Sequence, residues 1–188
     1  MSRRAHLYTT TQDFSKIRDV GECKNEVPYT FMMVLGVETK ICRSQLWSNY
    51  EPPIAIKANF EKGLQLLYNL YQFLETQEGF DKAALAKYQQ ETKDFFIQYP
   101  DRVSELFFLE AGELFDIPDS SMSIEEQNRS LYYEIKREAE AIEALLSQKE
   151  PHPNSYEKIY WLELARNDIK ILDPNWKSAC YYSLNTIG

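Results

Sequence analysis

Cys42 lies in the stretch ICRSQLW (residues 41–47), directly before Arg43, and a neighbouring arginine can favour the reactive thiolate. Nucleophilic catalysis by cysteine also needs a histidine base and usually an orienting amide or carboxylate. The chain has two histidines: His6 lies in a predicted strand, and His152 lies between two prolines in a predicted linker. Neighbouring side chains diverge on a strand or a helix, so Arg43 is poorly placed to act on Cys42. The sequence therefore favours Cys42 as a buried packing residue.

Metal-binding residue types show no recognised spacing. The three cysteines and two histidines include no Cys-x-x-Cys and no His-x-x-x-His pair, and an odd number of cysteines gives no disulfide framework. Glu134, Glu138 and Glu140 could hold calcium or a pair of metal ions, but a solvated helix face is the commoner reason for such a cluster. We therefore expect neither a metal ion nor a cofactor.

Two other kinds of reaction centre also lack support in the sequence. A loop that cradles phosphate needs closely spaced glycines before a helix, and no two of the six glycines lie fewer than 15 residues apart. Glycoside chemistry needs two acids across a cleft, but among 29 acidic residues some pair always looks suitable. The glycine spacing excludes nucleotide-loop enzymes, and the acids give no reason to propose a glycosidase.

The net charge of −8 is confined to one segment. Residues 101–150 carry thirteen acidic and five basic side chains. Residues 1–60 have an excess of two positive charges, residues 61–100 an excess of two negative charges, and residues 151–188 are balanced. An acidic surface repels nucleic acid and anionic membranes and attracts basic proteins. We therefore expect no nucleic-acid or membrane partner, and a basic protein as partner.

Targeting signals are not evident in the sequence. The first 14 residues contain no apolar core of a secretion signal. The longest apolar run, residues 31–37, is far shorter than the roughly 20 residues that cross a bilayer. Together with the cysteine usage, these features predict a cytoplasmic protein.

Short strands are expected near both ends of the chain. β-Favouring residues predict a strand at residues 5–10, followed by a polar loop to residue 26. Alternation predicts an edge or half-buried strand at residues 54–58, whereas residues 31–37 fit a strand or a helix equally well. Alternation in residues 176–182 predicts a final strand beside the N-terminal one.

Helical periodicity dominates the middle of the chain. Apolar residues that recur every three or four positions predict three helices, over residues 60–79, 81–99 and 103–116. Ser123 and Glu126 form a capping-box pattern that opens a helix to about residue 148. Ser155 is predicted to cap one further helix.

These elements predict an α+β fold, mostly α, in one domain spanning residues 1–188. Its expected parts are a strand-containing region (1–58), a helical region of about five helices (59–166) and a C-terminal strand region (167–188). Strands from both chain ends are expected to form a small sheet.

The predicted helix 103–116 carries a candidate binding surface. Phe108 and Leu109 lie off its apolar stripe, among glutamates, and interfaces often combine aromatic anchors with charges that set the encounter rate. The simpler alternative is that a neighbouring element covers both residues. The predicted partner-binding set is Glu105, Phe108, Leu109, Glu110, Glu113, Asp116, Glu134 and Glu138.

The opening Arg4-Ala5-His6-Leu7-Tyr8 and the block ICRSQLW…PPIAIKANFEKGLQLL (residues 41–67) resemble an uncharacterised family of small bacterial cytoplasmic proteins. Members of that family open with Met-x-Arg-x-Tyr-Leu-Tyr and carry a Cys-x-Ser-x-Leu/Ile-Trp element. His6 replaces the usual tyrosine, and the resemblance covers roughly the first 75 residues. The motif residues look structural, so the resemblance implies no catalytic residue.

In overall character the chain is similar to immunity proteins of bacterial toxin systems, which are small, acidic and free of catalytic motifs. Our leading hypothesis is a non-enzymatic protein that occludes the active site of a basic toxin through its acidic surface. An alternative is a small cytoplasmic enzyme whose site near the terminal sheet contains Tyr8, Tyr29 and Cys42. A third is a scaffold, which stable oligomers would distinguish; the sequence leaves the oligomeric state open.

Overall fold

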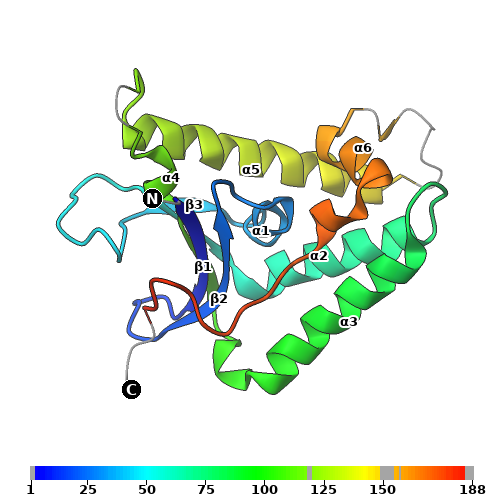
Figure 1. The fold of residues 1–188 in the computed structure, drawn as a ribbon, viewed down its shortest axis with the longest axis horizontal. Coiled ribbons are helices and arrows are strands. Elements are labelled where there is room, and N and C mark those ends of the chain that lie inside the picture. The colour runs from blue at the N-terminus through cyan, green and yellow to red at the C-terminus, as the bar shows by residue number, and fades with distance from the viewer. Residues whose placement is uncertain (1–2, 118–119, 149–154, 157, 185–188) are drawn as a thin grey trace.

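The computed structural model describes residues 3–117, 120–148, 155–156 and 158–184. Within these ranges the chain forms a five-stranded antiparallel sheet and six α-helices, an α+β fold (Figure 1). The strand order is β2-β1-β5-β4-β3. The strands are β1 (Arg4–Thr10), β2 (Ile17–Lys24), β3 (Lys40–Cys42), β4 (Ala55–Asn59) and β5 (Leu106–Glu110).

The helices lie mainly to one side of the sheet, with α5 running across the top of the view in Figure 1. They are α1 (Tyr29–Val34), α2 (Phe60–Glu75), α3 (Lys82–Gln98), α4 (Gly112–Phe115), α5 (Ile124–Leu146) and α6 (Tyr160–Asn167). In the described part of the chain, short 3-10 turns also lie at Pro100–Arg102 and Ile169–Leu172. No helix in the described part of the chain has both the length and the apolar character needed to cross a membrane.

Local caps explain where the three long helices begin. The side chains of Asn59 and Asp81 accept hydrogen bonds from the free backbone amides at the starts of α2 and α3. At α5 the predicted capping box is confirmed, because Ser123 and Glu126 each accept a hydrogen bond from the other's backbone amide. The helices predicted from residues 60, 81 and 123 are therefore confirmed.

The two faces of the sheet are buried in different ways. Leu7, Ile56, Phe107 and Leu109 point into the main hydrophobic core, which the helices cover. The opposite face carries a second, smaller cluster around Tyr8 and Phe108. Because successive side chains of a strand point to opposite faces, β5 contributes to both clusters.

The helix predicted over residues 103–116 is wrong. Leu106–Glu110 is the central strand of the sheet, paired with β1 on one side and β4 on the other. All five residues are buried, and the first four, Leu106–Leu109, form a continuous apolar run without polar alternation. A run of that length cannot be distinguished from a buried helix by periodicity alone, and the apolar residues on either side completed a false helical stripe.

Other local predictions are also corrected by the structure. Residues 17–24, expected to be a polar loop, form β2, and residues 31–37 contribute to helix α1. Helix α6 starts after Ile159 and not after Ser155. Residues 176–182 return beside the N-terminal strands, as expected, but as an irregular segment (red in Figure 1) and not as a regular strand. Isolated hydrogen bonds attach it to the sheet, such as Lys177 N to Val20 O at 2.9 Å.

Candidate functional site

The predicted anchor pair is not a surface feature. Phe108 and Leu109 are 0% exposed, and Glu110, which follows them on β5, is 2% exposed. The prediction that these three residues contact a partner protein is therefore wrong for the folded chain. Their burial follows from the position of β5 at the centre of the sheet, with one face against the helices and the other against the second cluster.

The remaining predicted acids lie in several places. Glu105 and Asp116 are exposed, and half-buried Glu113 accepts a hydrogen bond from the backbone amide of Arg4 at 3.1 Å. Glu134 is half-buried on α5. Glu138 is buried, and its carboxylate pairs with Arg137 at 3.0 Å. The structure thus divides these residues between α5, which carries Glu134 and Glu138, and the ends of β5 and α4, which carry the others.

An apolar groove lies between α4, α5 and α6, beside the loop that follows β2. Its volume is about 480 Å³, and Leu114, Phe115, Leu131 and Trp161 supply much of its lining. Among the described lining residues, only Glu26 and Glu134 are charged, and both are acidic. The groove therefore combines apolar walls with negative charge, a combination that the sequence analysis placed on the predicted helix over residues 103–116.

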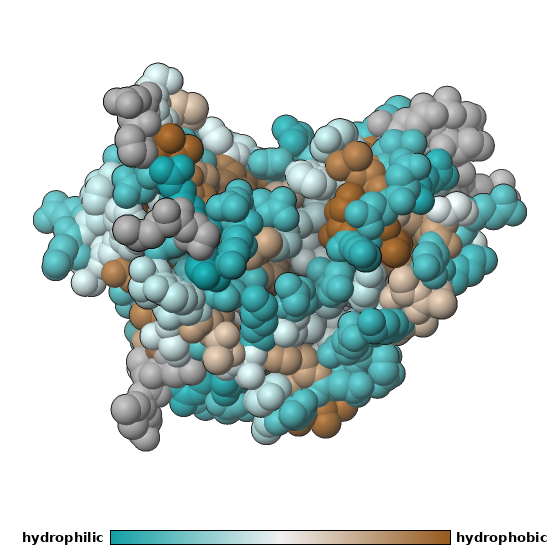
Figure 2. All heavy atoms as spheres, viewed as in Figure 1, coloured by the Kyte–Doolittle hydropathy of each residue, from teal (hydrophilic) through white to brown (hydrophobic). Residues whose placement is uncertain are grey.

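Large hydrophobic side chains are exposed in this groove and elsewhere on α5 and α6. Met122, which also lines it, is 43% exposed, and Tyr133 on α5 and Tyr160 on α6 are each more than 60% exposed. Figure 2 shows hydrophobic surface over α6 and at the start of α5, with hydrophilic side chains between the two areas. Exposed apolar surface with a polar rim is typical of protein-binding sites.

A second concentration of functional groups lies on the sheet face away from the helices. Strand register aligns Glu22, His6, Glu110, Ala55 and Cys42 in one row across β2, β1, β5, β4 and β3. Directly opposite residues in antiparallel strands place their side chains on the same face, within contact distance. Four titratable side chains therefore share one row across the sheet.

Glu110 is held in this row by the loop that follows β3. Its carboxylate accepts hydrogen bonds from the Ser44 hydroxyl at 2.8 Å and from the backbone amides of Gln45 and Leu46 at 2.5 and 3.2 Å. Burial raises the pKa of Glu110 to about 7, although these three hydrogen bonds act in the opposite direction. Glu110 is thus a buried acid that fixes a loop, and its proton equilibrium lies near neutral pH.

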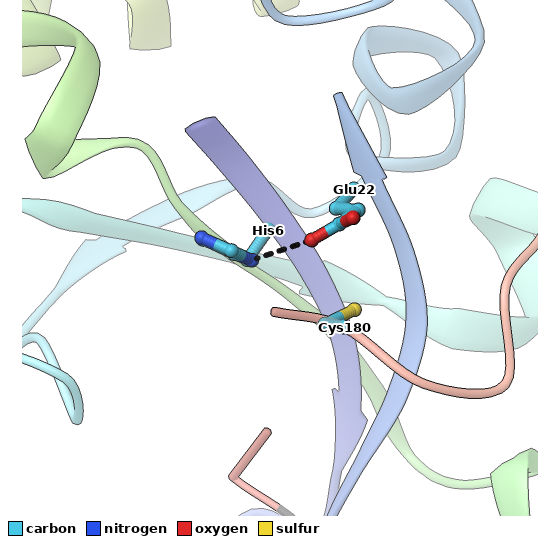
Figure 3. Close-up of side chains that lie close together, drawn as sticks. All are labelled: His6, Glu22 and Cys180. Carbon is cyan, nitrogen blue, oxygen red and sulfur yellow. Dashed lines mark ion pairs between the residues drawn. The ribbon is translucent and has the colours of Figure 1, made fainter. Parts of the chain in front are cut away.

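At the other end of the row, Glu22 and His6 lie beside the irregular residues 176–182, which we call the C-terminal segment. His6 Nδ1 lies 3.7 Å from Glu22 Oε2, and the sulfur of Cys180 lies close to both (Figure 3). The backbone amide of Tyr181 donates to Glu22 at 2.8 Å, and the Tyr8 hydroxyl donates to the carbonyl of Tyr182 at 2.6 Å. The C-terminal segment therefore covers this end of the row.

The three residues of the alternative enzyme hypothesis are not brought together. Tyr8 and Cys42 lie on the second sheet face, whereas Tyr29 lies in the main core, stacked on Trp161. Burial, reinforced by Glu110, raises the pKa of Cys42 to about 12, so its thiol is protonated at neutral pH. Neither Tyr8 nor Cys42 lines the groove between α4, α5 and α6.

The sequence did not reveal the row of polar side chains across the sheet, because its members lie far apart along the chain. Its members are separated by up to 104 residues, and only the strand register brings them together. The one sequence signal was the pair of motifs that resembled a known family. Tyr8 and His6 of the first motif, and Cys42 and Ser44 of the second, all lie on this face or bind Glu110.

The fold and the site define a single class: an α+β protein whose five-stranded antiparallel sheet carries helices on one face and a buried polar row on the other. The chain belongs to the family described as Domain of unknown function (DUF7822), whose model matches residues 6–152. This confirms the resemblance to an uncharacterised family. Neither a curated protein nor a solved structure is significantly similar to the chain.

Proposed function

We propose that this chain is a non-enzymatic protein that binds a basic partner protein in the groove between α4, α5 and α6. The observation that carries the proposal is the groove itself, which has apolar walls, two acidic lining residues and the exposed side chain of Met122. The partner is a protein with a basic surface, because the acidic excess of residues 101–150 includes the helices that form two sides of the groove.

Within this class we favour an immunity protein that occludes the active site of a toxin. A toxin that acts on nucleic acid or phosphate has a basic cleft, and an acidic groove with apolar anchors is complementary to such a surface. The binding residues differ from those expected from the sequence: Phe115, Met122 and Trp161 replace Phe108 and Leu109 as apolar contacts. Glu134 is retained as an acidic contact.

Catalysis on the second sheet face has weaker support. The thiol of Cys42 is protonated at neutral pH. The C-terminal segment and the loop that binds Glu110 also cover the polar row. A protonated, covered thiol is a poor nucleophile. The polar row is better explained as a structural or ligand-binding element than as a catalytic centre.

Charge reversal in the groove tests the proposal. The partner is recovered from the native host by affinity capture and purified separately, and its association rate with the chain is measured at low and high salt. The double variant Glu26→Lys/Glu134→Lys should associate about tenfold more slowly at low salt and show a flatter salt dependence, because the charges that steer the encounter are inverted.

A matched control distinguishes the effect of the groove charges from the effect of net charge. Glu140 and Glu143 are exposed on α5, the helix that carries Glu134, and they do not line this groove. Glu140→Lys/Glu143→Lys therefore makes the same change in net charge outside the groove. We expect the control to associate within about threefold of the wild-type rate, since it leaves the groove charges in place. Equal slowing of both double variants, or no slowing of either, would contradict binding at the groove.

A further inference from the structure

His6, Glu22 and Cys180 form a compact group of three different donor types. They come from β1, from β2 and from the C-terminal segment, and their donor atoms all lie within 4.8 Å of one another. His6 and Glu22 point toward each other from neighbouring strands, with the sulfur of Cys180 beside them (Figure 3). An imidazole, a carboxylate and a thiol are the three side-chain ligands that zinc uses most.

His6 is an unsatisfied buried group aimed into this cluster. Its side chain is 0% exposed, and neither ring nitrogen has a hydrogen-bond partner among the described residues. A buried polar group without a partner is rare and costs free energy. A neutral imidazole has a lone pair on one ring nitrogen, and a metal ion bound there would give this buried group a partner.

The two oxygens of Glu22 have different surroundings. Oε1 lies 3.2 Å from the guanidinium of Arg4 and 3.5 Å from the ammonium of Lys177. Oε2 faces His6 and accepts the backbone amide of Tyr181. The two cations thus hold Oε1 and orient the carboxylate, leaving Oε2 as the oxygen that can reach an ion shared with His6.

Cys180 is placed as a third ligand by its own contacts. Its backbone amide donates to Asp19 Oδ2 at 3.1 Å, and its thiol donates to the carbonyl of Gly21 at 3.2 Å. Metal binding would release the thiol proton to solvent and form the metal–sulfur bond in its place. In a tetrahedral zinc site the ligand atoms are about 3.3–3.8 Å apart. The His6–Glu22 spacing of 3.7 Å already fits, and the sulfur of Cys180 lies within 4.8 Å of both ligand atoms.

We propose that His6 Nδ1, Glu22 Oε2 and Cys180 Sγ bind a divalent transition-metal ion of the zinc class. The ion fastens the C-terminal segment to β1 and β2, where isolated hydrogen bonds otherwise attach it. The three ligands are separated by 16 and 158 residues along the chain, which is why no metal-binding spacing is visible in the sequence.

Cobalt and zinc titrations of the purified full chain test this site. Wild type should bind one equivalent of Co²⁺ and show a thiolate-to-cobalt charge-transfer band, which Zn²⁺ then abolishes by displacement. Zn²⁺ should also raise the melting temperature, because it binds the folded state. Cys180→Ser should lose the charge-transfer band and weaken Zn²⁺ binding more than about tenfold.

Two further variants keep the test independent of misfolding. Cys23→Ser removes another free cysteine, adjacent to Glu22 but outside the cluster, and should retain the band. Glu22→Gln should weaken Zn²⁺ binding but keep the band at saturating Co²⁺, since the thiolate remains. Circular dichroism confirms that each variant is folded. The proposal is overturned by a missing band in wild type, by a band that survives Cys180→Ser, by its loss in Cys23→Ser, or by unchanged affinity in Glu22→Gln.

Discussion

Replacing Phe108 with alanine should lower the free energy of unfolding by about 3–5 kcal/mol. The side chain is fully buried on the central strand, and its ring contacts those of Tyr8 and Phe14 at centroid distances of 6.0 and 5.1 Å. Truncation removes this burial and leaves a cavity between the sheet and its covering segments. Urea denaturation of wild type and variant measures the difference.

Ile97 provides the matched control for this truncation. It is 76% exposed on α3, so Ile97→Ala should change the free energy of unfolding by less than about 0.5 kcal/mol. If Phe108 were an exposed anchor, as the sequence suggests, Phe108→Ala would behave like this control. A small effect at Phe108 would therefore contradict the central position of β5.

The pH dependence of stability should carry a signature of Glu110. Its pKa in the folded chain is about 7, above its ordinary value of 4.5, so between these pH values the folded state binds more protons than the unfolded state. The contribution of Glu110 to stability is therefore largest below pH 4.5 and is lost as the pH rises to 7. The loss amounts to about 3 kcal/mol, from about 1.4 kcal/mol for each pKa unit.

Glu110→Gln isolates this effect, because the amide resembles the protonated carboxyl and does not titrate. Its carbonyl can accept the Gln45 and Leu46 amides, and its NH₂ can donate to Ser44. The unfolding free energy of wild type minus that of the variant should fall by about 3 kcal/mol from pH 4.5 to pH 7. Glu140 is exposed, so the unfolding free energy of Glu140→Gln should change with pH in the same way as that of wild type. A constant difference for Glu110→Gln would show that the pKa of Glu110 is the same in the folded and unfolded chain.

The sequence predicted the elements whose signals are local. Helices α2, α3 and α5 have apolar periodicity over at least 16 residues, and polar caps at Asn59, Asp81 and Ser123 mark where they begin. Strand β1 was likewise predicted from its β-favouring residues. These signals are contained within one element, so no knowledge of the surrounding fold is needed to interpret them.

Elements whose identity depends on distant neighbours were predicted poorly. Strand β5 has five buried residues and no alternation, and only its pairing with β1 and β4 distinguishes it from a helix. Residues 176–182 alternate like a strand but contact β2 through single hydrogen bonds. In both cases tertiary contacts, which the local pattern does not contain, determine the structure.

For the candidate sites too, composition was evident from the sequence, whereas the arrangement in space was not. The acidic character of residues 101–150 was evident from composition, but the strand at its start removes Phe108 and Leu109 from the surface. The groove requires α4, α5 and α6 to meet, and the polar row requires the register of five strands. Neither arrangement is encoded in residue spacing along the chain.

Hydrogen exchange of the chain alone and in complex with its partner tests most directly where binding occurs. We predict that backbone amides slow their exchange in α4, in the first half of α5 and in α6, which form the groove. Amides of α3, which lies away from these lining residues, should exchange at the same rate in both states. Protection confined to α3 or to the second sheet face, with unchanged exchange in α4, α5 and α6, would contradict the proposal that the acidic apolar groove is the binding site.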